Sequence, residues 1–196
     1  AGQPMVLAAL RCFENCPEIV QRLLVVSEAD LPAIEGDFGA ILDEMDVTLV
    51  TGGAARTDSV RNALAQVDPA VDLVAIHDAA RPCVTASAIA AVFAAAATTG
   101  AAILASPLHG TIKRTDADRA ITETLCREGL YQAHTPQVFE RDLLLAAYAT
   151  GTVATDDADL VERLGHAVKI VPDDPTNLKI TTPADLMLAH AILASR

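Results

Sequence analysis

Short apolar runs alternate with helical segments along this chain, and this alternation is the strongest constraint on its fold. Brief apolar runs bounded by turn residues are typical of buried strands, and apolar residues at helical spacing are typical of packed helices. These patterns predict strands at residues 23–26, 47–50, 72–76, 101–108, 131–133, 168–171 and 178–180, and helices at 4–16, 58–65, 85–97, 141–149, 156–164 and from Thr182 onward. Strands that alternate with helices indicate βαβ units, so we predict an α/β fold with a mainly parallel sheet. The chain has 196 residues, a length typical of one domain, and shows no internal repeat or linker. We therefore expect a single domain over residues 1–196.

One segment interrupts this pattern. Residues 111–115 and 120–126 are β-branched, alternating runs joined by Asp116-Ala117-Asp118, which predicts a β-hairpin. An isolated two-stranded hairpin is marginally stable in water, so this one needs a surface to pack on. A second copy of the chain is the simplest candidate, and packing on its own domain is the alternative. We therefore expect residues 109–127 to form a dimerisation arm in a homodimer.

Charge and cysteine content narrow the class of protein. A net charge of −12 argues against non-specific nucleic-acid binding, which requires a basic surface. No apolar run reaches the roughly 18 residues that a membrane span requires. The four cysteines form no C-x-x-C pair, which favours free thiols in a reducing compartment over disulfides or a zinc site. We expect a cytoplasmic protein that binds neither nucleic acid nor membrane.

The stretch His77-Asp78-Ala79-Ala80-Arg81-Pro82 follows the strand predicted at 72–76. Ligands bind at the carboxyl ends of strands in open α/β sheets. Asp78 can hold a divalent cation, and Arg81 can grip a phosphate with its bidentate fork. The alternative is an aspartate that caps the next helix and a solvated arginine. The two small alanines between the charged residues favour the ligand site, because they let a ligand approach the backbone.

Two further stretches are candidates for binding. Gly52 and Gly53 join a strand to a helix, where backbone amides and the helix start attract anions. Ser59 can read a ligand there or cap its own helix. Lys179 lies within an apolar run. Two roles fit this position: a charge that protects an edge strand from pairing with other chains, or a charge directed at a phosphoryl group. The five histidines show no catalytic pattern in the sequence, and only His77 lies near the predicted site.

Five motifs, taken in order, resemble one family. They read G-G-x-x-R-x-x-S-V-x-N-A-L, H-D-A-A-R-P, T-P-Q-x-F, T-D-D-A and N-x-K-I-T-x-P-x-D-L. This set resembles the 2-C-methyl-D-erythritol 4-phosphate cytidylyltransferases of non-mevalonate isoprenoid biosynthesis. The resemblance implies a Rossmann-like nucleotidyltransferase fold, a protruding β-hairpin arm and a Mg²⁺-dependent transfer of CMP from CTP to a polyol phosphate, with release of pyrophosphate.

The resemblance also implies a role for each matched residue. Asp78 and Lys179 would be catalytic, with Asp78 holding the metal and contacting both ligands, and Lys179 stabilising charge on the α-phosphate. The cytosine and ribose would be recognised by Gly52, Gly53 and Ser59. The polyol phosphate would be bound by Asp78, Arg81, Thr135 and Lys179, with Thr111 and Arg127 reaching it from the neighbouring subunit's arm.

Members of this family have a central strand and a glycine-rich triphosphate loop ahead of the segment that matches Ala1, so we expect the natural protein to have both.

Two alternatives to the methylerythritol enzyme remain. One is a ribitol or other pentitol 5-phosphate cytidylyltransferase, whose motif tends to read D-A-V-R-P where this chain has Ala80. The other is a non-catalytic CTP-binding relative, which would not need to keep Asp78 and Lys179.

Overall fold

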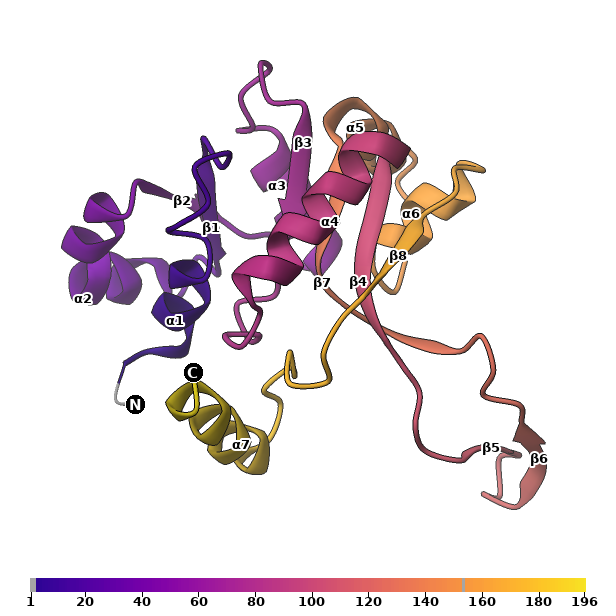
Figure 1. Ribbon diagram of the computed structural model, residues 1–196. Coiled ribbons are helices and arrows are strands. Elements are labelled where there is room, and N and C mark those ends of the chain that lie inside the picture. The colour runs from indigo at the N-terminus through magenta and orange to yellow at the C-terminus, as the bar shows by residue number, and fades with distance from the viewer. Residues whose placement is uncertain (1–2, 153) are drawn as a thin grey trace.

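The computed structural model describes residues 3–152 and 154–196, so Ala1 and Gly2 at the start of the expected domain, and Val153, lie outside the described residues. Figure 1 shows the arrangement of the helices and strands. In chain order they are α1 (Met5–Arg11), β1 (Arg22–Val26), α2 (Leu31–Glu44), β2 (Val47–Thr51), α3 (Arg56–Leu64), β3 (Leu73–Ile76), α4 (Ala86–Thr99), β4 (Ala101–Pro107), β5 (Ile112–Thr115), β6 (Ile121–Leu125), β7 (Tyr131–Glu140), α5 (Arg141–Ala149), α6 (Asp157–Arg163), β8 (Lys169–Pro172) and α7 (Pro183–Ala194).

The strands form two packed sheets and one separate hairpin. β1 and β2 pair in parallel, and a second sheet has the order β3-β7-β4-β8. β4 and β8 are parallel, whereas β7 runs antiparallel to both β3 and β4. The chain enters β7 directly from the hairpin that follows β4, without a crossover helix, and such a return must be antiparallel. The α/β class is confirmed, with mixed rather than uniformly parallel pairing.

Four elements differ from the sequence prediction. The strand expected at 131–133 extends through residue 140, as the ten-residue β7. The strand expected at 178–180 is wrong: this segment is irregular and is held by the bond from the Ile180 amide to the Ala80 carbonyl. The fourteen-residue helix α2 occupies a stretch for which no element was predicted. The helix expected at 4–16 is shorter, because α1 ends at Arg11 and turns carry the chain to Pro17.

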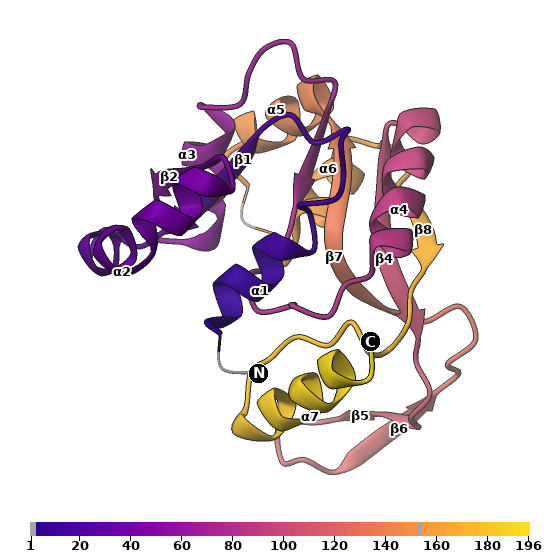
Figure 2. The same ribbon diagram turned by 60° about the vertical axis from the view of Figure 1, so that its left-hand side comes forward.

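Helices cover both faces of the second sheet (Figure 2). Successive strand residues point to opposite faces. Ala102 and Leu104 of β4 therefore pack with α4, while Ala101 and Ile103 pack with α5 and α6. The first sheet has its own buried cluster with α1 and α2, formed by Leu7, Leu24, Leu42, Met45 and Val47.

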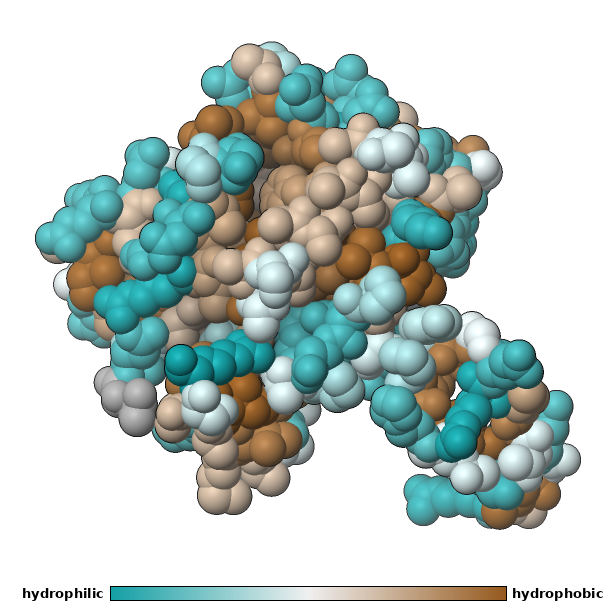
Figure 3. Space-filling view, in the orientation of Figure 1, coloured by the Kyte–Doolittle hydropathy of each residue, from teal (hydrophilic) through white to brown (hydrophobic). Residues whose placement is uncertain are grey.

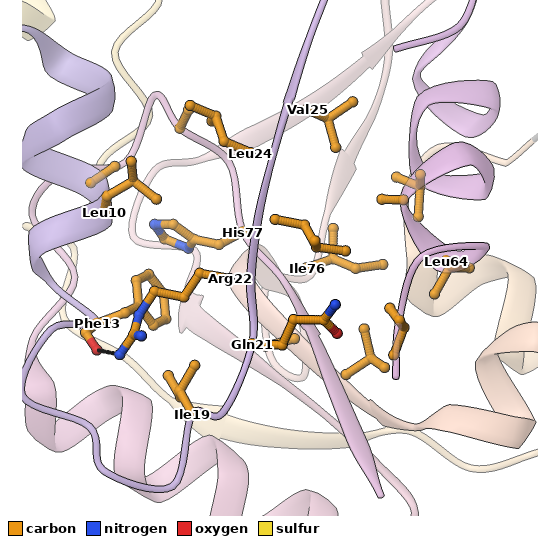
Figure 4. Close-up of a pocket in the computed structure, with 18 of the residues that line it drawn as sticks. Leu10, Phe13, Ile19, Gln21, Arg22, Leu24, Val25, Leu64, Ile76 and His77 are labelled. Atoms are coloured by element: carbon orange, nitrogen blue, oxygen red, sulfur yellow. Dashed lines mark hydrogen bonds between the residues drawn. The ribbon is translucent and has the colours of Figure 1, made fainter. Parts of the chain in front are cut away.

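A groove of about 410 Å³ separates the two sheets. β1 pairs with β2 and β3 pairs with β7, so among the described residues no strand pairs with the edges of β1 and β3 that face the groove. The lining is mostly aliphatic, with Leu24 and Val25 of β1, Ile76 of β3 and Leu64 of α3 (Figure 4). His77 stands at the same groove, and Asp78 and Ser59 also line it.

The hairpin of β5 and β6 extends away from both sheets, as expected for residues 109–127 (Figure 1). Its Ile121 side chain is exposed, at 64% of its full accessibility. Hydrophobic surface also lies over α7, which carries exposed Leu186, Met187 and Leu188 (Figure 3). No helix among the described residues is long and apolar enough to cross a membrane.

Candidate active site

The candidate residues follow the ends of three strands. Gly52 follows β2, Asp78 lies two residues after β3, and the segment with Lys179 follows β8. This is the edge of an open α/β sheet at which ligands bind. The sequence placed Asp78 there correctly. It did not show that Lys179, about a hundred residues later, reaches the same point.

Asp78 and Lys179 form an ion pair with 3.0 Å between Oδ2 and Nζ. The lysine side chain is 47% exposed and the aspartate side chain 19% exposed, so both remain accessible to a ligand. Burial raises the pKa of Asp78, but the hydrogen bond and charge of Lys179, with the charges of Arg56 and Arg81, outweigh burial and lower the pKa overall. Asp78 is therefore a carboxylate at neutral pH.

Arg81 links two segments of the chain, and its side chain is buried, with only 7% exposed. Its Nη1 donates to the carbonyl of Asn177 at 2.7 Å, and its Nε faces Asp78 Oδ2 at 3.5 Å. Asn177 in turn donates from Nδ2 to the carbonyl of Thr135. These bonds fix the segment that carries Lys179 against the loop that carries Asp78. In this structure Arg81 is directed into the protein, and the expected contact with the polyol phosphate stays a prediction.

His77 and Thr135 hold the backbone of Asp78. His77 Nε2 lies 3.1 Å from the Arg81 carbonyl, an acceptor, so Nε2 carries the proton. Nδ1 then accepts from the Thr135 hydroxyl at 3.1 Å, and Thr135 Oγ1 accepts the Asp78 amide at 3.0 Å. Burial lowers the pKa of His77 to about 4, which matches this neutral form. Thr135 is expected to contact the substrate, but in this structure its hydroxyl is hydrogen-bonded to His77 and to the amide of Asp78.

The turn after β2 needs both glycines. A Cβ on Gly53 would lie 2.3 Å from Asp58 Cβ, and a Cβ on Gly52 would lie 3.0 Å from Ser59 Oγ. Ser59 Oγ accepts the Gly53 amide at 3.0 Å and donates to the Ala55 carbonyl at 3.1 Å. Ser59 therefore closes the turn from within the first turn of α3, whereas the cap position of this helix is Ala55. Ser59 itself lines the groove, as does Asp78.

The structure also joins the motifs T-P-Q-x-F and T-D-D-A, which look like turns and caps in the sequence. Gln137 of β7 is buried and donates to Asp156 Oδ2 at 2.9 Å. Its Oε1 accepts the amide of Ala158 at 3.0 Å. Asp157, fully buried, binds Arg56 from the motif after β2. Sequence reasoning assigned no site role to these residues, and only their presence in the shared motifs could have indicated one.

A buried Ser106–His134–Asp173 arrangement lies behind the site. His134 Nδ1 is 2.8 Å from Asp173 Oδ2, and its Nε2 is 3.2 Å from Ser106 Oγ. These side chains lie far apart in the chain, so the sequence showed no such alignment. Because Ser106 and His134 are at most 4% exposed, no substrate can reach Ser106 in this structure. We interpret the set as support for β8 and the Lys179 segment.

Thr111 and Arg127 flank strands β5 and β6 of the arm, which extends away from β3, the strand that precedes Asp78 (Figure 1). Arg127 donates to the carbonyl of His109, which closes the base of the arm. The structure therefore does not bring these two residues to the site within one chain. This separation agrees with a role at a neighbouring subunit but does not test it.

Asp78 has the donor chemistry for a magnesium ion. Lys179 and Arg81 both face Oδ2, and no hydrogen bond to Oδ1 is found among the described residues. Mg²⁺ is commonly held by one or two carboxylates together with substrate phosphates and water. Within the described ranges no three His, Cys, Asp or Glu side chains form a metal cluster. The site therefore suits a metal shared with a phosphorylated ligand, rather than a closed protein cage.

Solved structures with the same arrangement include two cytidylyltransferases. The 2-C-methyl-D-erythritol 4-phosphate cytidylyltransferase of Thermus thermophilus has a TM-score of 0.85 and 32% identity, over 100% of this chain and 91% of that one. The 4-diphosphocytidyl-2C-methyl-D-erythritol synthase of Anaerococcus prevotii has a TM-score of 0.89 and 29% identity, over 99% of this chain and 90% of that one. These neighbours support the Rossmann-like nucleotidyltransferase fold.

Sequence comparison agrees over nearly the whole chain. A 2-C-methyl-D-erythritol 4-phosphate cytidylyltransferase of Rhodopirellula baltica is 45% identical over 98% of this chain and 84% of its own length. The 2-C-methyl-D-erythritol 4-phosphate cytidylyltransferase of Syntrophus aciditrophicus is 40% identical, also over 98% of this chain and 84% of its own length. The sequence model of the 2-C-methyl-D-erythritol 4-phosphate cytidylyltransferase family matches residues 1–195. The chain therefore belongs to this family.

Proposed function

We propose that this protein transfers CMP from CTP to 2-C-methyl-D-erythritol 4-phosphate. A phosphate oxygen of the polyol attacks the α-phosphorus of CTP, the bond to the bridging oxygen of pyrophosphate breaks, and 4-diphosphocytidyl-2-C-methyl-D-erythritol forms. Family membership supports this reaction. The observation that carries it is the accessible Asp78–Lys179 pair at the ends of β3 and β8.

In this proposal the protein acts by positioning and by charge, which suits phosphoryl transfer. Lys179 stabilises the negative charge that builds on the α-phosphate. Asp78 orients the reacting phosphates, and the turn of Gly52 and Gly53, together with Ser59, holds the cytidine. Arg81 and Thr135 maintain the loop on which Asp78 lies, as their buried hydrogen bonds indicate.

Asp78 would hold Mg²⁺ through its carboxylate, with the remaining ligands from phosphate oxygens and water. When bound, the ion would neutralise phosphate charge and align the two substrates. The free Oδ1 of Asp78 in the described part of the chain is the structural support for this assignment.

We further propose a homodimer built through residues 109–127. The exposed Ile121 and the poor stability of isolated hairpins support a partner at this surface. Thr111 and Arg127 would then reach the polyol phosphate bound to the other subunit. A cytoplasmic location is consistent with the four free cysteines.

The groove between β1 and β3 supports the expected strand ahead of Ala1. Its two facing strand edges have backbone groups that a further strand would pair, and buried groups of this kind are rarely left unpaired. We propose that in the natural protein a further strand pairs with these two edges and is followed by the triphosphate loop. The intact mass of the natural protein checks this directly. A mass of 20.4 kDa, that of these 196 residues, would contradict it.

The reaction is tested by incubating the full-length protein with CTP, Mg²⁺ and one polyol phosphate at a time, and by measuring pyrophosphate release. We expect methylerythritol phosphate to give the highest kcat/KM. Faster turnover with ribitol 5-phosphate would instead assign a pentitol enzyme. CTP binding by calorimetry without pyrophosphate release from any polyol would indicate a non-catalytic relative.

A further inference from the structure

Arg56 is a cation at the site for which neither the sequence pattern nor the family resemblance gave a role. It is the first residue of α3, directly after the turn that contains Gly52 and Gly53. Its side chain is 42% exposed and lines the groove together with Ser59 and Asp78. Arg56 therefore stands directly after the glycine turn, at the groove that Asp78 also lines.

A fully buried carboxylate fixes this arginine. Asp157 accepts hydrogen bonds from Arg56 Nη1 at 2.9 Å and from Nη2 at 2.6 Å. The hydroxyl of buried Tyr148 donates to the same carboxylate. A carboxylate without water is costly unless it is paired and hydrogen-bonded, so these donors account for its burial. In return, the guanidinium plane of Arg56 is held in one orientation.

The support behind Asp157 is also rigid. Asp156 caps α6 by accepting the Asp159 amide at 2.9 Å, and its other oxygen accepts Gln137 Nε2. Gln137 lies in β7, opposite Ile103 of β4, at the centre of the second sheet. The start of α6 is thus held against the second sheet. Asp157, the first residue of α6, is hydrogen-bonded to Arg56 and so holds the arginine in place as well.

Arg56 retains donors for a ligand. A guanidinium has five N–H groups, and the bidentate pair with Asp157 uses two of them. The hydrogen bond to Asp157 raises the pKa of Arg56, so the side chain stays charged at any pH at which the protein is folded. Arg56 and Asp78 line the same groove, and the charge of Arg56 contributes to the lowered pKa of Asp78.

We propose that Arg56 is a further nucleotide-binding residue, which donates to the ribose–phosphate part of CTP, and that Asp157 and Tyr148 are its positioning residues. Arg56 follows the turn assigned to the cytidine and shares a groove with the carboxylate assigned to the phosphates, which favours this part of the nucleotide over the base or the polyol. The inference rests on the proposed function, because it assumes that CTP lies between the turn and Asp78.

The test compares CTP affinity and kinetics in the full-length protein carrying Arg56→Lys or Asp157→Asn. Lysine keeps the charge but loses the planar fork. Each change should raise both the calorimetric Kd and the KM for CTP about tenfold, while the KM for the polyol phosphate changes less than about twofold. Because the two residues act as a unit, the double variant should be little worse than either single one.

Arg163→Lys is the matched control. Arg163 makes a bidentate pair with Asp159 on the same helix α6, but both residues lie on the surface. This variant should leave the affinity for CTP unchanged. If Asp157→Asn does not fold, Arg56→Lys and Tyr148→Phe still test the inference. Tyr148→Phe should raise the KM for CTP less than Arg56→Lys does.

An unchanged KM for CTP in Arg56→Lys, with or without a lower melting temperature, would overturn the inference and leave Arg56–Asp157 a structural pair. Failure of the proposed function has a different signature. In that case the unmodified protein releases no pyrophosphate, whereas calorimetry with CTP still reports whether Arg56 binds the nucleotide.

Discussion

The centre of the site and the arm are both rich in polar residues, but they are built in opposite ways. At the centre, Asp78, Arg81, Thr135 and Asn177 are hydrogen-bonded to one another or to neighbouring backbone, in largely buried surroundings. On the arm, the ion pair between Arg114 and Glu123 joins side chains that are 62% and 53% exposed. Exposed ion pairs contribute little stability, whereas unpaired buried groups are costly. The centre is therefore held together within one subunit, whereas a partner surface for the arm is a proposal.

Lys179→Ala should have the largest effect among changes at the centre. It removes the charge assigned to the transferring phosphate, and we expect kcat to fall by roughly a hundredfold to a thousandfold with a smaller change in KM. Because Lys179 is half exposed, the melting temperature should change little. Steady-state kinetics and thermal unfolding on one preparation check both points. A normal kcat would remove Lys179 from the chemistry.

Thr135→Val tests whether the centre is rigid because of its hydrogen bonds. Valine has nearly the same shape but leaves His77 Nδ1 and the Asp78 amide without their partner. An unsatisfied buried group costs about 1–3 kcal/mol, so we expect lower unfolding free energy and kcat reduced about tenfold or more. Thr135→Ser keeps the hydroxyl and should restore most of both. If serine is as defective as valine, the hydrogen-bond chain is not the reason.

Arg127→Ala tests the arm as part of the site. The proposed contact with the neighbouring subunit's substrate predicts a rise of about tenfold in the KM for the polyol phosphate, with the KM for CTP nearly unchanged. Arg119, at the tip of the arm, offers a control: Arg119→Ala should leave both constants as they are. A polyol KM that does not change in the Arg127 variant would separate the arm from the active site.

Cysteine labelling gives the smallest effect but compares the two regions in one experiment. Cys126 of the arm is exposed. Burial raises the pKa of Cys12 to about 11, and its Sγ contacts the carbonyl of Pro82 next to the central loop. Since the thiolate is the reactive form, Cys126 should be alkylated at pH 8 long before Cys12. Mass spectrometry of digested samples reads both rates, and equal rates would show that the centre opens as readily as the arm.

Much of the fold was predictable because most elements follow simple periodicity. β1, β2 and α5 occur within about a residue of the predicted bounds, and Thr182 caps α7 through Asp185 as its sequence indicated. β7 was underestimated because Pro136 lies within it. Proline lacks the donor that a ladder needs, and here it falls where the pairing with β4 shifts register. Helix α2 contains Gly36 and Gly39, which weaken helical propensity, while packing on β2 stabilises it.

The site was predictable only in part. The strand end before Asp78 and the glycine turn were visible, because each follows an apolar run directly. The meeting of Asp78 with Lys179, and the burial of Arg81, depend on long-range packing that no local pattern encodes. The same holds for Arg56 and Asp157, which lie 101 residues apart. Local patterns located the residues, and only tertiary structure showed which of them contact one another.

The most direct test of this account is the Mg²⁺-dependent turnover of Asp78→Asn in the full-length protein, with its fold monitored by circular dichroism. Asparagine keeps the shape of the side chain but loses the charge that would hold the metal. We predict a native spectrum and cooperative unfolding, with pyrophosphate release reduced to background at every Mg²⁺ concentration. Near-normal turnover would mean that the metal and the reacting phosphates are held elsewhere, and would contradict the central role given to Asp78.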